Sequence, residues 1–251
     1  MGKQNQQPIS ISIRPAKSAD LAALSRLDIA ANATHPLISQ SFTYPFQALK
    51  LFLAHLQYCF ARPEEYRILV ARVRPVLELA STLPVLNSDA DSGVDVSIVC
   101  ESDDRDADEG RGEIVGFVMW RECQQGSGLM DDEKREEWDW ISQLPKGADI
   151  RLWKRYAEVM SSDSGEAGIE IQKLAVAPQY QRRGIGGQLL KAFLDEVECR
   201  GVKDPVLVRA SRDAKELYER FGWRIMREFK LDLRGWGIYK AYVNFEMVRD
   251  A

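Results

Sequence analysis

The feature of the sequence that most limits its possible folds is a glycine-rich turn between a predicted strand and a predicted helix. Apolar residues predict a strand over 169–177, and apolar residues at helical spacing predict a helix over 185–200. Three glycines stand where the helix begins: Gly184, Gly186 and Gly187. Because the first N–H groups of a helix lack partners within it, a helix start without side chains is a place where phosphate can bind.

The turn suits a pyrophosphate but matches neither of two common nucleotide-binding loops. Arg182 and Arg183 add positive charge beside it. The Walker loop needs Lys and then Ser or Thr after its last glycine, and this chain continues with Gln188 and Leu189. The dinucleotide-binding loop needs a third glycine where this chain has Leu189. Close packing alone would also explain the glycines, so this alternative stays open.

Strands and helices are also predicted on both sides of this turn. Those before it are a strand over 9–14, helices over 21–29 and 45–61, and strands over 67–73 and 114–120, which are expected to pair. Those after it are a strand over 205–210, a helix over 212–221, and strands over 224–233 and 238–248 joined by the turn 234–237. This order predicts an α/β (α+β) fold with a mixed central sheet of about seven strands flanked by helices.

These elements predict a single domain over residues 9–250, after a polar segment over 1–8 that is expected to be disordered. Two insertions interrupt the domain, at about 78–113 and 124–168. The first is acidic: residues 87–113 include ten Asp or Glu, which predicts a loop that buries little. It is either a solvated insertion or an acidic lure for a cationic substrate.

The second insertion carries apolar residues at helical spacing, which predicts two helices. The first would carry Trp138, Ile141 and Leu144, and the second Leu152, Tyr156 and Val159. These helices either pack their aromatic side chains onto the body of the domain or form a lid over a bound substrate. The candidates for contact with that substrate are Trp138, Trp140, Trp153 and Tyr156.

Two segments resemble the signatures of the GNAT superfamily of N-acetyltransferases. Residues 181–186, Gln-Arg-Arg-Gly-Ile-Gly, resemble its Gln/Arg-x-x-Gly-x-Gly/Ala motif, and Pro178 stands where the family has it. Residues 214–223 resemble its Ala-x-x-Leu-Tyr-x-x-x-Gly-Phe signature, with Trp223 as the last residue. The close resemblance covers about residues 167–225 and implies the GNAT fold, while the two insertions have no counterpart in the minimal form of the family.

The resemblance implies that acetyl-CoA is the cosubstrate. In that family a strand binds the pantetheine arm through its backbone, and the matching residues here are Leu174, Ala175 and Val176. The turn after it binds the pyrophosphate with main-chain N–H groups, and the matching residues are Arg182, Arg183, Gly184, Ile185, Gly186 and Gly187. Ser211 stands where many members have an Asn that contacts the coenzyme, which weakens one contact. The four cysteines lack the spacing of a zinc site, so no metal is expected.

The resemblance also implies candidates for proton transfer. Tyr218 matches the family tyrosine that often protonates the departing thiolate, although such a hydroxyl can instead orient the thioester. Glu170 lies fourteen residues before Gly184, the spacing of the catalytic glutamate in histone-type members, which makes it the candidate base; otherwise it is a surface glutamate. His35 and His55, the two histidines, are expected to be structural.

Composition limits the partners. The chain has 34 basic and 38 acidic residues, so it lacks the basic excess typical of nucleic-acid binding. No run approaches the roughly 18–20 apolar residues that span a bilayer, and the N-terminus lacks the apolar core of a signal peptide. We therefore expect neither nucleic acid nor membrane as a partner, and we expect a cytoplasmic location, with the nucleus as an open alternative. The sequence leaves the oligomeric state open.

Three functions stay open at this point. The first, slightly favoured, is transfer of an acetyl group from acetyl-CoA to a small-molecule amine, because an acidic loop and an aromatic insertion can close over a small cation. The second is acetylation of a protein lysine or N-terminus, for which an open groove is expected. The third is a non-catalytic module that binds acyl-CoA, against which the presence of Tyr218 and the glycines argues.

Overall fold

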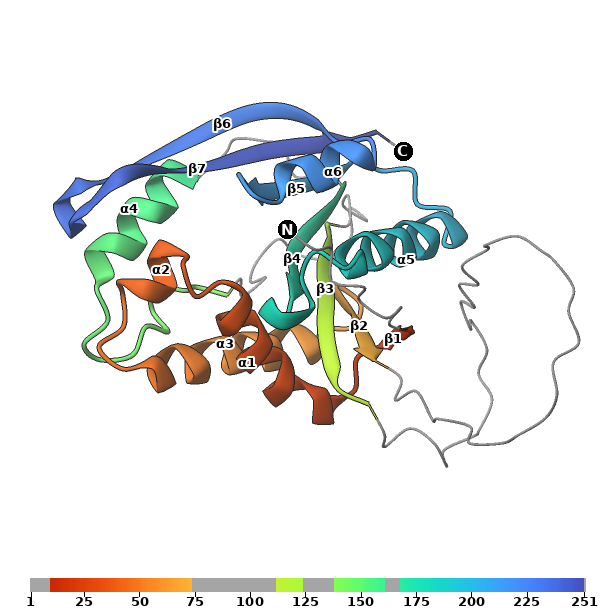
Figure 1. The fold of residues 1–251 in the computed structure, drawn as a ribbon, viewed down its shortest axis with the longest axis horizontal. Coiled ribbons are helices and arrows are strands. Elements are labelled where there is room, and N and C mark those ends of the chain that lie inside the picture. The colour runs from red at the N-terminus through yellow and green to blue at the C-terminus, as the bar shows by residue number, and fades with distance from the viewer. Residues whose placement is uncertain (1–9, 74–111, 124–137, 161–167, 251) are drawn as a thin grey trace, which may run out of the picture.

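The computed structural model describes residues 10–73, 112–123, 138–160 and 168–250. Its strands form one mixed sheet in the order β1-β2-β3-β4-β5-β7-β6 (Figure 1). The strands are β1 (Ile11–Pro15), β2 (Tyr66–Val73), β3 (Ile114–Cys123), β4 (Gly168–Val176), β5 (Val206–Ser211), β6 (Arg224–Leu233) and β7 (Ile238–Arg249). The helices are α1 (Leu21–Ala31), α2 (Pro36–Ser39), α3 (Pro45–Phe60), α4 (Ile150–Met160), α5 (Ile185–Cys199) and α6 (Lys215–Arg220). The predicted seven-stranded mixed sheet is therefore confirmed.

The sheet is open between its two central strands. The parallel pairing of β4 with β5 extends over three residue pairs and ends at Ile171 and Val208. Beyond this point β4 continues to Val176 along β3, and β5 continues to Ser211 along β7. The register between β3 and β4 also shifts at Gln172, which forms a β-bulge. The bulge lies at the point where β4 begins to separate from β5. Beyond Ile171, the backbone N–H and C=O groups on the β5 side of β4 are therefore not paired with a neighbouring strand of the described sheet.

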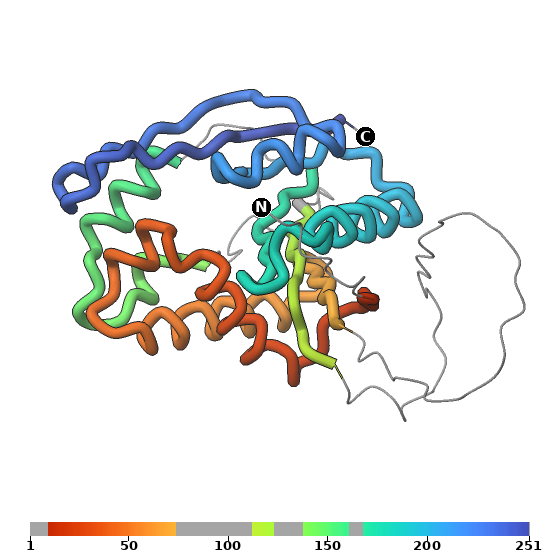
Figure 2. Tube along the Cα trace, viewed as in Figure 1, coloured from red at the N-terminus to blue at the C-terminus, as the bar shows by residue number. Residues whose placement is uncertain are grey.

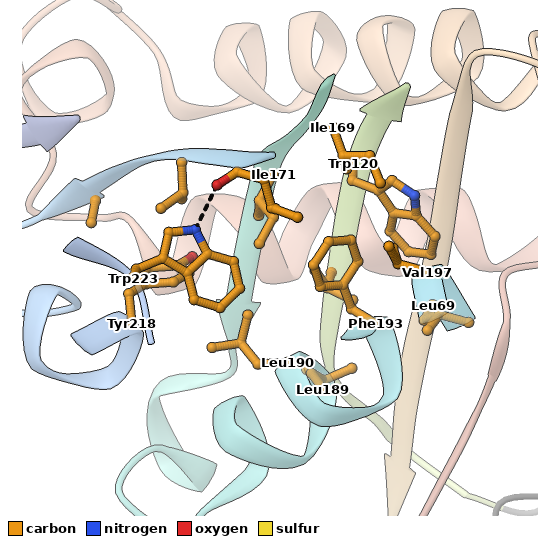
Figure 3. Close-up of a cluster of buried hydrophobic side chains, with 14 of the residues drawn as sticks. Leu69, Trp120, Ile169, Ile171, Leu189, Leu190, Phe193, Val197, Tyr218 and Trp223 are labelled. Carbon is orange, nitrogen blue, oxygen red and sulfur yellow. Dashed lines mark hydrogen bonds between the residues drawn. The ribbon is translucent and has the colours of Figure 1, made fainter. Parts of the chain in front are cut away.

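The helices cover both faces of the sheet. Helix α5 packs on one face against Trp120 and Ile171, with Phe193 and Trp120 edge to face at 5.0 Å between ring centroids (Figure 3). Helices α1 and α3 pack on the other face, where Phe117 and Met119 of β3 are buried. The alternation of side chains along β3 supplies both layers, as expected for a strand that is buried on each side.

A third apolar cluster joins parts of the chain that lie far apart in sequence. It contains Leu37 of α2, Leu152 of α4 and Leu231 of β6, all of which are buried. Figure 2 shows these segments together, with the long β6–β7 hairpin running past α4. Asp149 fixes this arrangement because it caps α4 by accepting the Leu152 N–H and accepts the indole N–H of Trp236 at 2.9 Å.

The structure agrees with most predicted elements and corrects two. The strands over 67–73 and 114–120 pair as expected, although the acidic insertion between them lies almost wholly outside the described residues, as does the segment 1–8. The helix predicted around Trp138 and Ile141 is wrong, because residues 138–149 form turns. Asp139 accepts the Ile141 N–H at 2.9 Å, an Asx turn that competes with a helix. The short helix α2 was not predicted. None of the described helices has the length and apolarity needed to cross a membrane.

Candidate functional site

The opening between β4 and β5 leads into a cavity of about 600 Å³. On the β4 side its lining includes residues 171–174, on the β5 side residues 208–211, and from α6 the side chain of Tyr218. The far walls come from α1, α3, α4, the loop around Trp140, and β7. A volume of this size is typical of a site for a small molecule.

The backbone of β4 presents hydrogen-bonding groups to the opening. The Ala177 N–H donates to the Val115 carbonyl at 2.8 Å, so Ala177 faces β3. Because the backbone groups of a strand alternate in direction, those of Ala175 also face β3 and those of Leu174 and Val176 face the opening. The Gln181 amide donates to the Val176 carbonyl at 3.0 Å, which leaves the N–H of Val176 directed into the opening. Of the three residues predicted on this strand, Leu174 and Val176 therefore have the suitable direction, and Ala175 does not.

The glycine-rich turn leads from the end of β4 into α5. Gly184 is the N-cap residue, with a φ of +82° that a side chain would strain. The Gln188 N–H donates to the Gly184 carbonyl at 3.1 Å and begins the helical pattern. The N–H groups of Ile185, Gly186 and Gly187 therefore have no partner within the helix. The helix dipole is positive at this end of α5, which favours the binding of an anion.

The glycines of this turn also meet packing requirements. A Cβ atom on Gly186 would lie 3.3 Å from Cδ2 of Leu217, and one on Gly187 would lie 3.6 Å from the ring of Phe221. A Cβ on Gly184, in contrast, would meet no heavy atom within 4 Å among the described residues. Packing against α6 thus accounts for part of the pattern, and the open surface at Gly184 fits a bound group.

Tyr218 lines the cavity from α6, and its side chain is 4% exposed. Its ring lies edge to face with Trp223 at 5.5 Å, and Trp223 is itself fixed by donating to the Val206 carbonyl at 3.0 Å (Figure 3). Burial raises the pKa of the Tyr218 hydroxyl above its usual value, so the group keeps its proton at neutral pH. A rigidly held, protonated hydroxyl is what a proton donor needs.

Glu170 lies on β4, one residue before the part of the strand that lines the cavity. Its carboxylate accepts a hydrogen bond from the Gln172 amide at 2.7 Å and lies 3.5 Å from Nη1 of Arg209. Both neighbours line the cavity. A base at this position would act next to the cavity wall, directly or through a water molecule.

Between β4 and α1, a buried ion pair forms part of the cavity wall. Nζ of Lys173 lies 2.5 Å from Oδ2 of Asp28, and the Asn32 amide donates to Oδ1 of the same carboxylate at 2.9 Å. The Asp28 side chain is 2% exposed and that of Lys173 14% exposed. Lys173 also lies over the ring of Phe52, 4.5 Å from its centroid. The carboxylate is therefore fully engaged.

Both histidines line the cavity, in contrast to the purely structural role expected from the sequence. His35 does cap α2, because its Nδ1 accepts the Leu37 N–H at 3.2 Å; the neutral ring then carries its proton on Nε2. Burial, and secondly the charge of Lys173, lower the pKa of His35 to about 4. The same two causes lower the pKa of His55 well below its usual value. Both rings are therefore neutral at physiological pH.

Several lining residues escaped prediction. Among them are Asp28, Lys173, Arg209, Tyr242 and Asn244. A signal for two of them exists in the sequence, because Asp28 follows Leu27 on the apolar face of a helix and Lys173 interrupts an apolar strand. Of the predicted lid residues, Trp140, Trp153 and Tyr156 line the cavity, whereas Trp138 packs on His55 and Tyr58. Within the described ranges, no group of His, Cys, Asp or Glu side chains could hold a metal ion.

The chain is similar to known proteins in sequence and fold. A family model described as "Acetyltransferase (GNAT) domain" matches residues 156–231. The fold is similar to that of a Corynebacterium glutamicum protein described as histone acetyltransferase HPA2 and related acetyltransferase, with a TM-score of 0.56, 16% identity, and coverage of 96% of this chain and 97% of that one. It is also similar to yncA of Salmonella typhimurium, solved with its cofactor acetyl-CoA, with a TM-score of 0.50, 14% identity, and coverage of 96% and 93%. A comparison with curated proteins finds no match.

Proposed function

Because a GNAT acetyltransferase domain model matches residues 156–231 and the fold is similar to that of an acetyltransferase, we propose that this chain is a GNAT acetyltransferase that transfers an acetyl group from acetyl-CoA to an amine. The observation that carries the proposal is the opening between β4 and β5, which has inward-facing backbone groups at one end and a cavity of about 600 Å³ at the other. A long, extended cosubstrate fits such an opening, and the acceptor amine fits the cavity beyond it. The match of the family model to residues 156–231, which include the glycine-rich turn and Tyr218, supports the same reading.

In this proposal the turn before α5 holds the pyrophosphate of acetyl-CoA. The donors are the main-chain N–H groups of Ile185, Gly186 and Gly187, and the side chains of Arg182 and Arg183 add charge. Leu174 and Val176 bind the pantetheine arm through the backbone groups that face the opening. Ser211, at the end of β5, can donate one hydrogen bond to the same arm. The cosubstrate itself supplies an activated acetyl group.

Transfer forms a C–N bond and breaks a C–S bond, so the amine loses a proton and the departing sulfur gains one. Tyr218 holds a proton on its hydroxyl, at the wall where the two strands separate, and we assign it the role of proton donor. Glu170 is our candidate for the group that takes the proton from the amine. The Leu174 and Val176 N–H groups can stabilise negative charge on the acetyl oxygen.

A small-molecule amine remains the favoured acceptor. Described residues of five helices and three strands line the cavity, whereas a protein lysine needs a surface groove. Acetylation of a protein lysine or N-terminus is the second candidate. A module that binds acyl-CoA without catalysis is the third, and the buried, cavity-lining Tyr218 argues against it.

Two measurements on the purified protein test the proposal. Calorimetry with acetyl-CoA should show binding heat, and release of free thiol from acetyl-CoA should rise when an amine is added. A panel of small amines and lysine peptides then distinguishes the acceptor classes. Absence of binding heat would overturn the proposal, and binding without thiol release on any amine would favour the non-catalytic module.

A further inference from the structure

The acceptor half of the cavity is walled by aromatic side chains. They are Phe52, Trp140, Trp153, Tyr156 and Tyr242. Trp140 and Trp153 stack at 5.6 Å with an interplanar angle of 23°, and the His35 ring lies between Tyr156 and Tyr242, at 5.6 and 4.9 Å from them. Rings in mutual contact form a rigid apolar surface, which favours an apolar or aromatic ligand.

The same wall offers little to a second positive charge. Among the described residues that line the cavity, Asp28 supplies the one carboxylate, and Lys173 and Asn32 already engage it. Arg209 brings a further cation, paired with Glu170 at 3.5 Å. The face of Phe52 is also occupied, since Lys173 lies 4.5 Å from its centroid. A second ammonium would therefore enter the cavity without a free counter-charge among the described lining residues.

The pKa values of His35 and His55 indicate how the cavity affects a positive charge. Burial and the nearby Lys173 lower the pKa of both rings, so the cavity disfavours a positive charge at two separate positions. The same effect on a bound amine keeps it neutral, which is the form that attacks a thioester. The aromatic wall and the electrostatics of the cavity therefore both favour an apolar amine that binds in its neutral form.

We propose that the acceptor is a primary amine on an apolar, preferably aromatic, body that carries no second positive charge. This inference rests on the proposed function and specifies its substrate class. It excludes polyamines and lysine side chains of peptides as preferred acceptors, since the first carry further ammonium groups and the second lie on a polar backbone.

Two matched pairs of amines test it. Hexylamine and 1,6-diaminohexane differ by one ammonium group, and 2-phenylethylamine and ethylamine differ by one ring. We expect kcat/KM, measured by thiol release, to be at least about 10-fold higher for the first member of each pair. A preference for the diamine or for a lysine peptide would overturn the inference and leave the proposed function standing. Transfer to none of the amines would overturn both.

Substitutions of cavity-lining residues test whether the cavity wall determines these preferences. Lys173→Met frees the Asp28 carboxylate, so the preference for hexylamine over the diamine should fall toward one. The double variant Asp28→Asn/Lys173→Met removes both charges, which should restore the preference and keeps the test open if the single variant unfolds. Trp140→Ala should reduce the advantage of 2-phenylethylamine, whereas Phe46→Ala, at a side chain that is 54% exposed and outside the cavity, should not. Unchanged ratios in Lys173→Met and Trp140→Ala would contradict the proposal.

Discussion

At the scale of single residues, the position of Tyr218 connects packing with chemistry. The ring is fixed by Trp223, which is in turn fixed by the Val206 carbonyl, so the hydroxyl has a defined direction. Burial keeps it protonated, and the structure gives it no hydrogen-bond partner among the described residues. Such a group is available to a ligand that enters between the strands.

Tyr218→Phe tests this role at the lowest structural cost. The variant keeps the ring and its contact with Trp223 but lacks the proton, so kcat should fall by roughly 10²–10⁴-fold, the range of general acid catalysis, with little change in the affinity for acetyl-CoA. Steady-state thiol release and calorimetry measure the two quantities. Tyr239→Phe, at a hydroxyl-bearing side chain that is 86% exposed, serves as the control.

The result separates the two roles of the hydroxyl. Loss of a proton donor should lower kcat with the KM for acetyl-CoA little changed, whereas loss of an orienting group should change both. A variant as fast as the parent protein would rule out both.

At the scale of elements, the start of α5 decides whether a diphosphate can bind. Gly186→Glu places a carboxylate among the free N–H groups, and we expect the binding heat of acetyl-CoA to disappear. Gly186→Ala should weaken binding much less, because its Cβ would meet a flexible end of Leu217 at 3.3 Å. Calorimetry measures both.

The control for this prediction is Gly235→Glu. It introduces the same side chain in the turn between β6 and β7, where a Cβ meets no heavy atom within 4 Å among the described residues. If Gly186→Glu bound acetyl-CoA like Gly235→Glu, while melting curves showed both variants folded, the helix start would not be the diphosphate site.

The elements themselves were largely predictable, because each carries a strong local pattern. The start of α5 is an example: an apolar strand, three glycines and a helical repeat fixed its place to within a residue. The segment 138–149 was mispredicted for the opposite reason. Its apolar spacing fits a helix, but Asp139 offers its side chain to the backbone and Pro145 follows, so turns form instead.

At the scale of the whole molecule, the cavity is built from segments far apart in sequence. Lys173 and Asp28 are separated by 145 positions, and Asn244 lies beside Ser211 through strand pairing. No local sequence pattern predicts a contact between residues so far apart in the chain. The glycine-rich turn, which is the proposed donor side of the site, was therefore predictable from a motif, whereas the residues of the proposed acceptor side come together only in the tertiary fold.

The neutral histidines make the stability of the whole fold depend on pH. The pKa of His35 is 6.5 when unperturbed and about 4 in the fold, where Lys173, Asp28, Tyr156 and Tyr242 surround it. Between these values the unfolded chain binds a proton that the folded chain does not, so the free energy of unfolding decreases as the pH falls from 6.5 toward 4. His55 acts in the same direction.

The variant His35→Asn measures this effect. Asparagine retains an oxygen that can accept the Leu37 N–H and cap α2, but it does not titrate. Between pH 7 and pH 4.5 its free energy of unfolding should fall by about 2 kcal/mol less than that of the parent protein, as denaturant titration can show. Parallel pH profiles would mean that His35 is not buried as a neutral ring.

The two ends of the cavity have separate structural origins. The end that the proposed function assigns to the acetyl donor lies within residues 174–218. The aromatic wall comes from α3, α4, the loop at Trp140, and Tyr242 of β7. A chain built this way can exchange the wall, and with it the amine it accepts, without touching the backbone groups that hold the donor. A change of acceptor preference then needs only a few substitutions in segments that the proposed acetyl transfer does not use.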